Sequence, residues 1–278
     1  MEVVDLFCGI GGFSAGARVF ATPILGVDND DEMVRLWAGN TKGKVKLVQL
    51  WVDAIDWPPL HARIHTHMSP PCTTLSKARR GPRCVSDGLD YLRDSLTFVR
   101  PRQSWSMETV STPLVRDFLQ KFKESNPTFE MDWMVLNAAD YGCPSTRIRI
   151  IVGNPDLVKE LRQVPVHRVS VRDAFRIAQT HLPADYIKNN TKTRARRACV
   201  RHVSNQCHTQ TASHPLVWCR EDGQTVRCLN VEETAIVMGF PRDWILPTSS
   251  RAAIKALGNA VPPPLASAIM MAAVKGLA

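Results

Sequence analysis

Apolar and polar positions follow a strand-then-helix order along the first half of the chain. Short apolar runs predict buried strands over residues 2–7, 23–27, 46–52, 65–69, 104–108, 131–137 and 149–153. Helical spacing of apolar positions predicts helices over residues 14–20, 31–38, 89–99 and 114–125. Strands that alternate with helices indicate an α/β protein with a doubly wound, mostly parallel sheet.

The pattern changes in the second half of the chain. Residues 155–228 carry scattered charges and little periodicity, which indicates a small separate lobe. Helices are predicted again over residues 231–238, 250–256 and 262–276. We therefore expect a catalytic and cofactor-binding domain over 1–154, a lobe over 155–228, and a return segment over 229–278 that completes the first domain. Residues 73–88 are predicted to form a long loop, and loops of that length are usually functional.

Composition narrows the class of protein. The formal net charge is +9 over 278 residues, which favours a polyanionic partner such as nucleic acid, although a merely basic protein fits the charge equally well. No run approaches the ~20 apolar residues of a membrane span, and no signal peptide is visible. The eight cysteines form no C-x-x-C pair, so we expect a soluble intracellular protein with reduced, mostly buried thiols.

Glycines and acids mark a nucleoside site at one sheet edge. Gly9, Gly11 and Gly12 follow the first strand, where a Gly-rich turn exposes backbone N–H groups to a ligand. Asp28 and Asp53 end the next two strands, and acids there suit ribose hydroxyls and an adenine amino group. Together they predict an adenosine ligand without phosphate, such as S-adenosylmethionine. The alternative is that either aspartate only caps a turn.

Cys72 is the candidate nucleophile. It follows Pro70 and Pro71 at the end of the fourth strand, at the same edge of the sheet. Attack of its thiolate on carbon-6 of cytosine would make carbon-5 able to accept a methyl group. Glu108, at the end of the next strand, is placed to serve ring nitrogen N3. Two arginines spaced two apart lie on one face of a later strand. These are Arg147 and Arg149.

Six segments resemble motifs of the bacterial-type DNA cytosine-C5 methyltransferases, in the order of that family. The segments lie at 5–13 (Asp-Leu-Phe-Cys-Gly-Ile-Gly-Gly-Phe), 69–72 (Ser-Pro-Pro-Cys), 107–110 (Met-Glu-Thr-Val), 136–149 (through Arg147 and Arg149), 232–241 (ending Met-Gly-Phe-Pro) and 257–263 (Leu-Gly-Asn-Ala-Val-Pro-Pro). The resemblance implies a Rossmann-like class I methyltransferase fold with a small target-recognition lobe. It also implies methyl transfer to carbon-5 of a flipped-out cytosine in double-stranded DNA, giving 5-methylcytosine and S-adenosyl-L-homocysteine.

The resemblance also implies roles for single residues. Cys72, Glu108, Arg147 and Arg149 are the catalytic set. The implied cofactor contacts are Phe7, Gly9, Ile10, Gly11, Gly12, Asp28, Asn29, Asp53, Ala54, Pro71, Leu89, Asn259 and Val261. Phe7 would pack on the adenine, Asp28 would hold the ribose, and Asp53 would contact the adenine amino group.

Basic residues in the long loop and in the lobe are candidate phosphate contacts. The DNA-binding candidates are Ser76, Lys77, Arg79, Arg80, Arg194, Arg196, Arg197 and Arg201. A solvated basic linker is the plainer interpretation. Polar candidates for reading base edges include Asn205, Gln206 and Gln210, and so short a lobe predicts a site of about two to four base pairs. The cysteine and histidine spacings of the lobe do not match common zinc sites, so no metal is expected.

The chain departs from the family at several flanking positions. Thr73, Leu75, Thr109 and Ser145 replace the usual Gln, Phe, Asn and Gln, and Val237 and Met238 replace the usual Arg and Gln. These departures leave open a catalytically weakened DNA-binding protein. A tRNA cytosine-C5 methyltransferase is a second alternative, and an amino-methyltransferase a third, although that class has an aromatic residue where this chain has Cys72.

Partners and compartment follow from the same resemblance. We expect a monomer that binds double-stranded DNA and no membrane, with a cognate restriction endonuclease as a candidate partner. The expected compartment is the bacterial cytoplasm, or the host cytoplasm or nucleus if the protein is viral.

Overall fold

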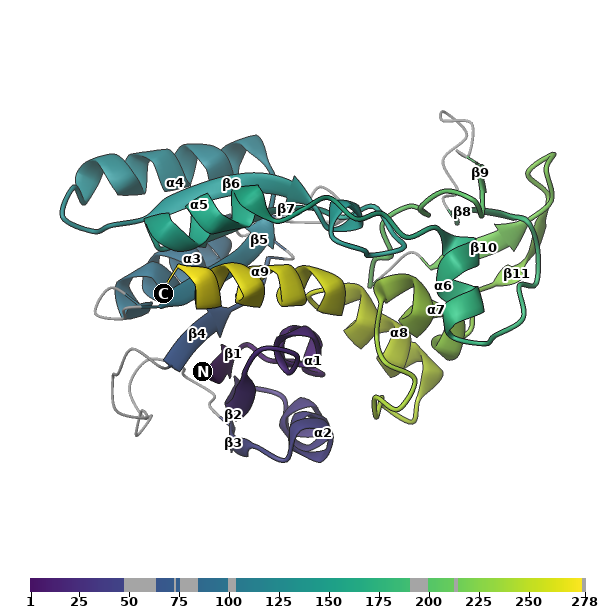
Figure 1. The fold of residues 1–278 in the computed structure, drawn as a ribbon, viewed down its shortest axis with the longest axis horizontal. Helices are drawn as coiled ribbons and strands as arrows, with labels where there is room; N and C mark the ends of the chain where they lie inside the picture. Colours follow the sequence, from purple (N-terminus) through teal and green to yellow (C-terminus); the bar gives the residue numbers. More distant parts are fainter. Residues whose placement is uncertain are drawn as a thin grey trace.

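The structure is a computed structural model of the 278-residue chain. It describes residues 1–47, 64–72, 74–75, 85–99, 104–190, 200–212 and 215–276. Two sheets of different size are present in these residues, and they lie at opposite ends of the long axis of the molecule (Figure 1).

The larger sheet has seven strands in the order β3-β2-β1-β4-β5-β7-β6. They are β1 (Glu2–Leu6), β2 (Thr22–Asp28), β3 (Lys44–Leu47), β4 (Ile64–Met68), β5 (Trp105–Val110), β6 (Asp132–Asn137) and β7 (Ile148–Gly153). The first five strands pair in parallel, and β7 runs antiparallel to both β5 and β6. The prediction of a mostly parallel α/β sheet is therefore confirmed.

Helices cover both faces of this sheet because alternate strand residues point to opposite sides. Val4 and Leu6 pack with α3 (Val85–Val99) and α4 (Pro113–Ser125) in one core. Val3 packs on the other face with α1 (Gly12–Ala17), α5 (Pro155–Gln163) and α9 (Pro263–Lys275). The sheet is thus doubly wound, with α9 crossing the face opposite α3 and α4 (Figure 1).

Several predicted boundaries differ from those observed. Helix α3 begins at Val85, so residues 85–88 of the predicted loop are helical, and the rest of that loop, apart from 74–75, lies outside the described residues. Gly88 concealed the helix start because glycine is a poor helix former. Helix α1 ends at Ala17 rather than at residue 20, β5 continues to Val110, and the end of the third predicted strand lies outside the described residues.

The smaller sheet is antiparallel, with the order β11-β10-β8-β9. Its strands are β8 (Tyr186–Asn189), β9 (Arg201–His202), β10 (Leu216–Cys219) and β11 (Thr225–Cys228). Helices α6 (Val171–Ile177) and α7 (Val231–Met238) share a core with it through Phe175, Trp218 and Val237. Helix α8 (Ser250–Asn259) packs beside α7 (Figure 1).

Helix α5 departs from the expected lobe. Its apolar residues Leu157, Val158 and Leu161 pack in the same core as α1 and α9, so the first element after residue 154 belongs to the larger sheet. The helix is amphipathic, but its many charged residues resemble the scattered charges of the lobe that follows it. The division of the chain at residues 154 and 228 stays a prediction.

One stretch is apolar and long enough to span a membrane by composition, Ser250–Lys275, among the described residues. It comprises α8 and α9, which Pro262 separates, and 67% of the window is buried inside the protein. Apolarity of this kind is that of core helices.

A buried carboxylate near the end of β1 connects this strand to two helices. Asp5 is 1% exposed, and its Oδ2 accepts a hydrogen bond from the Ser14 hydroxyl at 2.6 Å in α1. The Trp37 indole of α2 (Asp31–Thr41) donates to the Ser14 hydroxyl at 2.9 Å and lies 3.4 Å from the same carboxylate oxygen. Burial raises the pKa of Asp5 to about 7 despite these donors. A charge there is costly without a cation to pair it.

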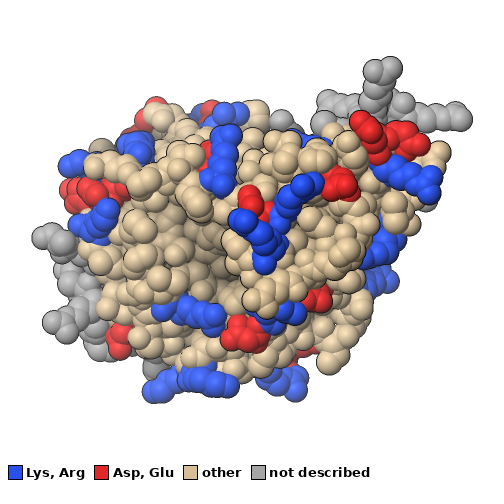
Figure 2. Space-filling model, turned by 45° about the vertical axis from the view of Figure 1, so that its right-hand side comes forward, with Lys and Arg blue, Asp and Glu red and all other residues tan. Residues whose placement is uncertain are grey.

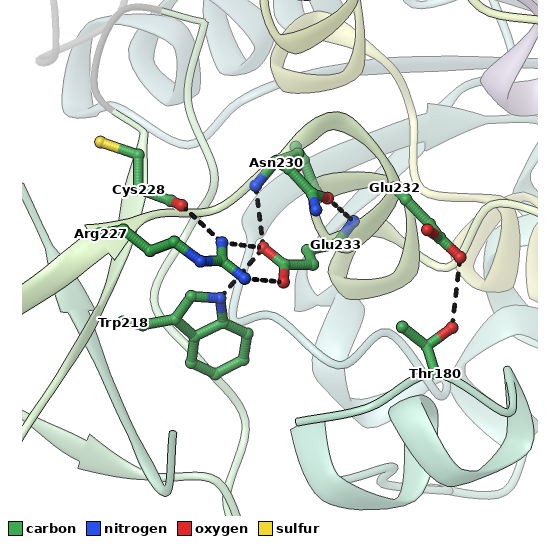
Figure 3. Close-up of polar contacts among 8 residues, drawn as sticks. Thr180, Trp218, Arg227, Cys228, Asn230, Glu232 and Glu233 are labelled. Atoms are coloured by element: carbon green, nitrogen blue, oxygen red, sulfur yellow. Dashed lines mark hydrogen bonds and ion pairs between the residues drawn. The ribbon is translucent and has the colours of Figure 1, made fainter. Parts of the chain in front are cut away.

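The smaller sheet is held to α7 by a second buried carboxylate (Figure 3). Glu233 is 3% exposed and its two oxygens accept two hydrogen bonds from Arg227, at 2.8 and 2.6 Å. The Trp218 indole donates to it at 3.1 Å and the Asn230 backbone N–H at 2.8 Å. Asn230 in turn caps α7 by accepting from the Glu233 backbone. One side chain therefore connects β10, β11 and the helix that returns to the catalytic domain.

Asp5→Asn should flatten part of the pH dependence of stability. A carboxyl whose folded pKa lies above its unfolded pKa destabilises the folded state as pH rises, until the folded pKa is passed. Between pH 5.5 and 8 the wild type should lose about 2 kcal/mol of unfolding free energy relative to Asp5→Asn. Urea unfolding of both proteins at the two pH values measures this. His65 and His67 have pKa values lowered by burial, but they contribute equally to both proteins. An unchanged difference would contradict the assignment.

Glu233→Gln should destabilise the protein by about 2–3 kcal/mol, because it replaces charge-assisted hydrogen bonds with weaker ones and leaves one donor unpaired. Glu232→Gln is the matched control. Glu232 lies on the surface, where it contacts Thr180 and Arg242 at 3.3 and 3.2 Å, and its loss should cost under about 1 kcal/mol. Denaturant unfolding of the two variants gives the comparison, and equal effects would sink the anchoring role of Glu233.

Candidate active site

The turn after β1 is shaped by three residues with positive φ. Phe7, Gly9 and Gly11 have φ of 58, 50 and 83°, a conformation that glycine adopts freely and an aromatic residue adopts at a cost. The Cys8 N–H donates to Val27 O at 3.0 Å, which holds the turn against the end of β2. Strain at Phe7 is of the kind found at functional sites, where the surrounding structure imposes it.

Asp28 closes this turn. Its Oδ2 accepts the Gly9 N–H at 2.8 Å, and its Oδ1 accepts the N–H groups of Asn29 and Asp30 at 2.8 and 3.1 Å. Burial raises its pKa, and the three backbone donors oppose that rise. The carboxylate therefore lies at the end of β2 beside the glycine turn, as predicted.

The residues present fit the adenosine part of S-adenosylmethionine. A Cβ built on Gly9 would meet nothing within 4 Å, so open space lies over this part of the turn. Phe7 is only partly buried and offers an aromatic surface beside it. Asp28 supplies an anionic acceptor with lone pairs for hydroxyl groups. Gly12, by contrast, is in close contact with Val261 O, so the turn opens toward Gly9 and not toward α1.

Other predicted cofactor residues have varied environments. Asn29, Pro71 and Asn259 are exposed, and Leu89 packs against the core on α3. The side chains of Ile10 and Val261 are buried in separate cores, at 1 and 3% exposure. Asp53 and Ala54 lie outside the described residues, so their roles stay predictions.

The nucleophile segment is attached directly to the cofactor turn. β4 lies next to β1, and after it the Ser69 N–H donates to Leu6 O at 3.2 Å. The Ser69 hydroxyl donates to Phe7 O at 3.1 Å. Cys72 follows three residues later and is partly buried against the core that contains Leu6 and Met68. The thiol and the cofactor turn therefore lie at the same edge of the sheet.

Glu108 and Arg149 form a buried ion pair at this edge. Arg149 Nε lies 2.7 Å from Glu108 Oε1, and the two side chains are 13 and 6% exposed. The strands β5 and β7 that carry them are neighbours in the sheet. Both charges affect the Cys72 thiol. Burial and the charge of Glu108 raise the pKa of this thiol, and Arg149 and Arg147 oppose part of that rise.

Arg147 is committed to backbone carbonyls. It is 3% exposed, and its Nη1 donates to Gly258 O at 3.0 Å and to Gln210 O at 3.3 Å. Its Nη2 lies 3.5 Å from Asn259 O. Burial lowers the pKa of Arg147 to about 10, which leaves it cationic at neutral pH. Arg147, directly before β7, thus contacts Gln210 and the carboxyl end of α8, while Arg149 faces Glu108.

Most predicted DNA contacts fall outside the described residues. These are Ser76, Lys77, Arg79, Arg80, Arg194, Arg196 and Arg197, and their roles stay predictions. Arg201 is described, and its Nη1 donates to Gln206 O and Cys207 O at 3.1 and 3.3 Å. The prediction that Gln210 reads base edges is wrong, because its side chain is fully buried and pairs with the Thr211 carbonyl and the Leu216 N–H. Periodicity in so short a lobe did not distinguish buried from exposed amides.

Two residues contribute to the site although sequence reasoning assigned them no role. Tyr91 of α3 meets Phe7 edge-to-face, with ring centroids 6.5 Å apart. Ser69 was noted only as part of a motif, yet its hydroxyl connects the two halves of the site. The position of Tyr91, two residues after Leu89 in a helix expected to border the cofactor pocket, was the available signal. The described residues contain no group of three or more His, Cys, Asp or Glu side chains arranged to hold a metal ion.

Comparison with solved structures identifies the class of fold. A DNA modification methyltransferase encoded within an E. coli prophage superimposes with a TM-score of 0.69 at 16% identity, covering 100% of this chain and 99% of the other. The Dnmt2 methyltransferase of S. pombe gives a TM-score of 0.64 at 16% identity, covering 99 and 98%. With its seven-stranded sheet, the chain has the fold of the class I S-adenosylmethionine-dependent methyltransferases.

Sequence comparison finds similarity to one class of methyltransferase. The sequence model of the C-5 cytosine-specific DNA methylases matches residues 153–275. The type II methyltransferase M.AplI of Arthrospira platensis is 26% identical over 97% of this chain and 84% of its own length. The type II methyltransferase M1.HphI of Haemophilus parahaemolyticus is 26% identical over 99 and 87%. The chain is therefore similar to the C-5 cytosine-specific DNA methylases over residues 153–275 and to type II methyltransferases over nearly its whole length.

The charges around Cys72 should control its reactivity in opposite directions. Glu108→Gln removes a negative charge that raises the thiol pKa, so the midpoint of iodoacetamide alkylation should move to lower pH. Arg149→Gln removes a positive charge that lowers the thiol pKa, so the midpoint should move to higher pH. Mass spectrometry of the Cys72 peptide across a pH series measures both. Shifts of the same sign would show that the thiol does not sense these charges.

Proposed function

We propose that the protein transfers a methyl group from S-adenosylmethionine to carbon-5 of a flipped-out cytosine in double-stranded DNA, through a covalent Cys72 adduct at carbon-6. The observation that carries the proposal is the convergence of Cys72 with the Glu108–Arg149 ion pair and the cofactor turn at one sheet edge. The similarity to the C-5 cytosine-specific DNA methylases and to type II methyltransferases supports the substrate class.

Each side chain has a chemical task in this scheme. S-adenosylmethionine, when bound beside Phe7, Gly9 and Asp28, supplies an electrophilic methyl group. The Cys72 thiolate attacks carbon-6 of the cytosine, and Glu108 stabilises the charge that develops at N3 by donating a hydrogen bond or proton. Arg149 fixes the Glu108 carboxyl in place. Once carbon-5 carries the methyl group, its proton passes to solvent water, the carbon-6–sulfur bond breaks, and Cys72 leaves as the thiolate. N3 returns its proton to Glu108, which restores the aromatic ring.

The resting thiol is protonated at neutral pH because burial and Glu108 raise its pKa. A neutral thiol is weakly reactive, so the site avoids adventitious alkylation and oxidation when no base is bound. Transfer of the Cys72 proton to the Glu108 carboxylate, as the cytosine enters, would generate the Cys72 thiolate and the protonated Glu108 together. Arg147 and Arg149 stabilise the thiolate formed.

The surface is compatible with a nucleic-acid partner. The formal net charge of +9 favours association with phosphates. Figure 2 shows a hollow on one face of the molecule, with Lys and Arg side chains, interspersed with some Asp and Glu, around it. Reaction at carbon-5 requires the cytosine to leave the duplex, because the atom is otherwise within the base stack. The small sheet β8–β11 leaves room for few base contacts, so we retain a site of about two to four base pairs. A monomeric state and a restriction endonuclease partner stay predictions.

Trapping the adduct tests the proposal. Duplex DNA with 5-fluorocytosine at random positions, incubated with the protein and labelled S-adenosylmethionine, should give a covalent complex because fluorine cannot leave as the carbon-5 proton does. The complex should be absent from Cys72→Ala and present in Cys143→Ala, which alters a buried cysteine in a different core from the one that Cys72 packs against. Mass spectrometry should place the cross-link on the Cys72 peptide.

The nucleic acid supplied separates the competing functions. An adduct on 5-fluorocytosine-substituted RNA and none on DNA would overturn the DNA assignment and favour the tRNA alternative. S-adenosylmethionine binding with an adduct on neither polymer would indicate a protein that keeps the fold without the reaction. Sequencing the trapped DNA gives the length of the recognised site.

A further inference from the structure

Helix α3 approaches the nucleophile segment more closely than any side chain at Gly88 would allow. A Cβ built on Gly88 would lie 2.4 Å from Thr74 Oγ1, and 2.6 and 2.9 Å from Leu75 Cγ and Cδ2. Real Cβ contacts are essentially never shorter than 3.0 Å. The backbone of α3 in its first turn therefore packs directly on residues 74 and 75.

Residues 74 and 75 belong to the turn that carries the nucleophile. The Leu75 N–H donates to Cys72 O at 3.1 Å, which closes the turn. Leu75 is 4% exposed and is part of the core that includes Met68 and Leu92. The Thr74 hydroxyl is buried and has no hydrogen-bond partner among the described residues. The hydrogen bond from the Leu75 N–H to Cys72 O couples these two residues, so we expect a displacement of Leu75 to displace Cys72.

The same part of α3 borders the cofactor turn. Tyr91 lies one turn after Gly88 and meets Phe7 edge-to-face at 6.5 Å. Leu89, adjacent to Gly88, packs against the core that also contacts Phe7 and Cys72. The first two turns of α3 therefore contact both the nucleophile turn and the aromatic residue of the cofactor site.

We propose that Gly88 is a positioning residue for Cys72. Because Gly88 has no side chain, α3 packs closely on Thr74 and Leu75, and this contact holds the Cys72 thiol in place relative to Glu108 and the cofactor turn. The inference rests on the proposed function for its consequence in catalysis, but the contact itself is a geometric feature of the protein alone. Leu75 and Thr74 are the side chains on which the first turn of α3 packs.

The expected size of the effect follows from the contact. A methyl group at Gly88 must push the turn away by several tenths of an ångström or more, because two of its neighbours lie under 3.0 Å. Misplacement of a reacting group by about 1 Å costs on the order of 100-fold in rate. We therefore expect Gly88→Ala to slow adduct formation by roughly 10- to 100-fold.

The first experiment compares Gly88→Ala with Gly39→Ala. Gly39 is also in a helix, α2, but its Cβ would meet only Ile245 Cδ1 at 3.5 Å, an ordinary contact. Alanine is the better helix former at both positions, so helix propensity alone would stabilise both variants. We expect Gly39→Ala to form the 5-fluorocytosine adduct at the wild-type rate and Gly88→Ala to form it slowly, with S-adenosylmethionine binding retained. A wild-type rate in Gly88→Ala overturns the inference.

A mutant cycle ties the effect to the contact. Thr74→Ala/Leu75→Ala removes both side chains that the new methyl group would meet. In that background the added Gly88→Ala change should alter the rate far less than it does in the wild type, because interacting positions are not additive. Equal factors in the two backgrounds would show that Gly88 acts through something other than this turn.

Iodoacetamide alkylation separates failure of the inference from failure of the proposed function, because it requires no nucleic acid. Gly88→Ala should change the alkylation rate of Cys72 several-fold, while that of exposed Cys228 stays constant. If the wild type forms no adduct on any polymer, the proposed function fails and this readout still decides the inference. If Gly88→Ala leaves the alkylation rate of Cys72 unchanged, the positioning role of Gly88 is overturned.

Discussion

The parallel pairing of β1 with β4 determines how the cofactor turn and Cys72 lie relative to each other. The ladder aligns Leu6 with Met68, so the two strands end level with each other. Two hydrogen bonds from Ser69, to Leu6 O and Phe7 O, extend the alignment beyond the strands. A slip of the register would separate the cofactor turn from Cys72, because the strand rise is about 3.3 Å per residue. Phe7 has a strained backbone at this junction, which the hydrogen bonds on both sides enforce.

The charged side chains around the thiol are largely buried. Glu108 and Arg149 neutralise each other at 2.7 Å, while Arg147 is surrounded by carbonyl oxygens and retains its charge. Cys72 therefore experiences one anion and two cations within a region where burial disfavours any charge. Such a site is poised: a small change in the position of one charged group alters which atom carries the proton.

The main sheet and the catalytic residues were predictable because their signals are local. Apolar runs that end in Asp28 or in the Pro-Pro-Cys segment mark strand ends, and strand ends share one edge. The features that could not be predicted depend on close packing between segments. The sequence predicts a loop at the start of α3 because Gly88 has a low helix propensity. The close contact between Gly88 and Leu75, which leaves no room for a side chain, is not visible in the local pattern of apolar residues.

The lobe was less predictable for a related reason. Its polar residues were read as exposed, yet Gln210 is buried and serves the backbone. Arg227 and Glu233 connect the smaller sheet to α7, but nothing in their spacing distinguishes them from surface charges such as Glu232 and Arg242. Side chains that satisfy buried backbone groups become recognisable only when the fold is known.

The packing of α1 on α9 has a consequence for how the chain folds. Phe13 and Ala17 share a core with Leu265 and Ile269, about 250 residues later in the sequence. Contacts so distant along the chain raise the contact order, and they form only after the whole lobe has been synthesised. The glycine turn thus remains without its supporting helix for most of translation. The amino-terminal half therefore reaches its final packing only after α9 has left the ribosome.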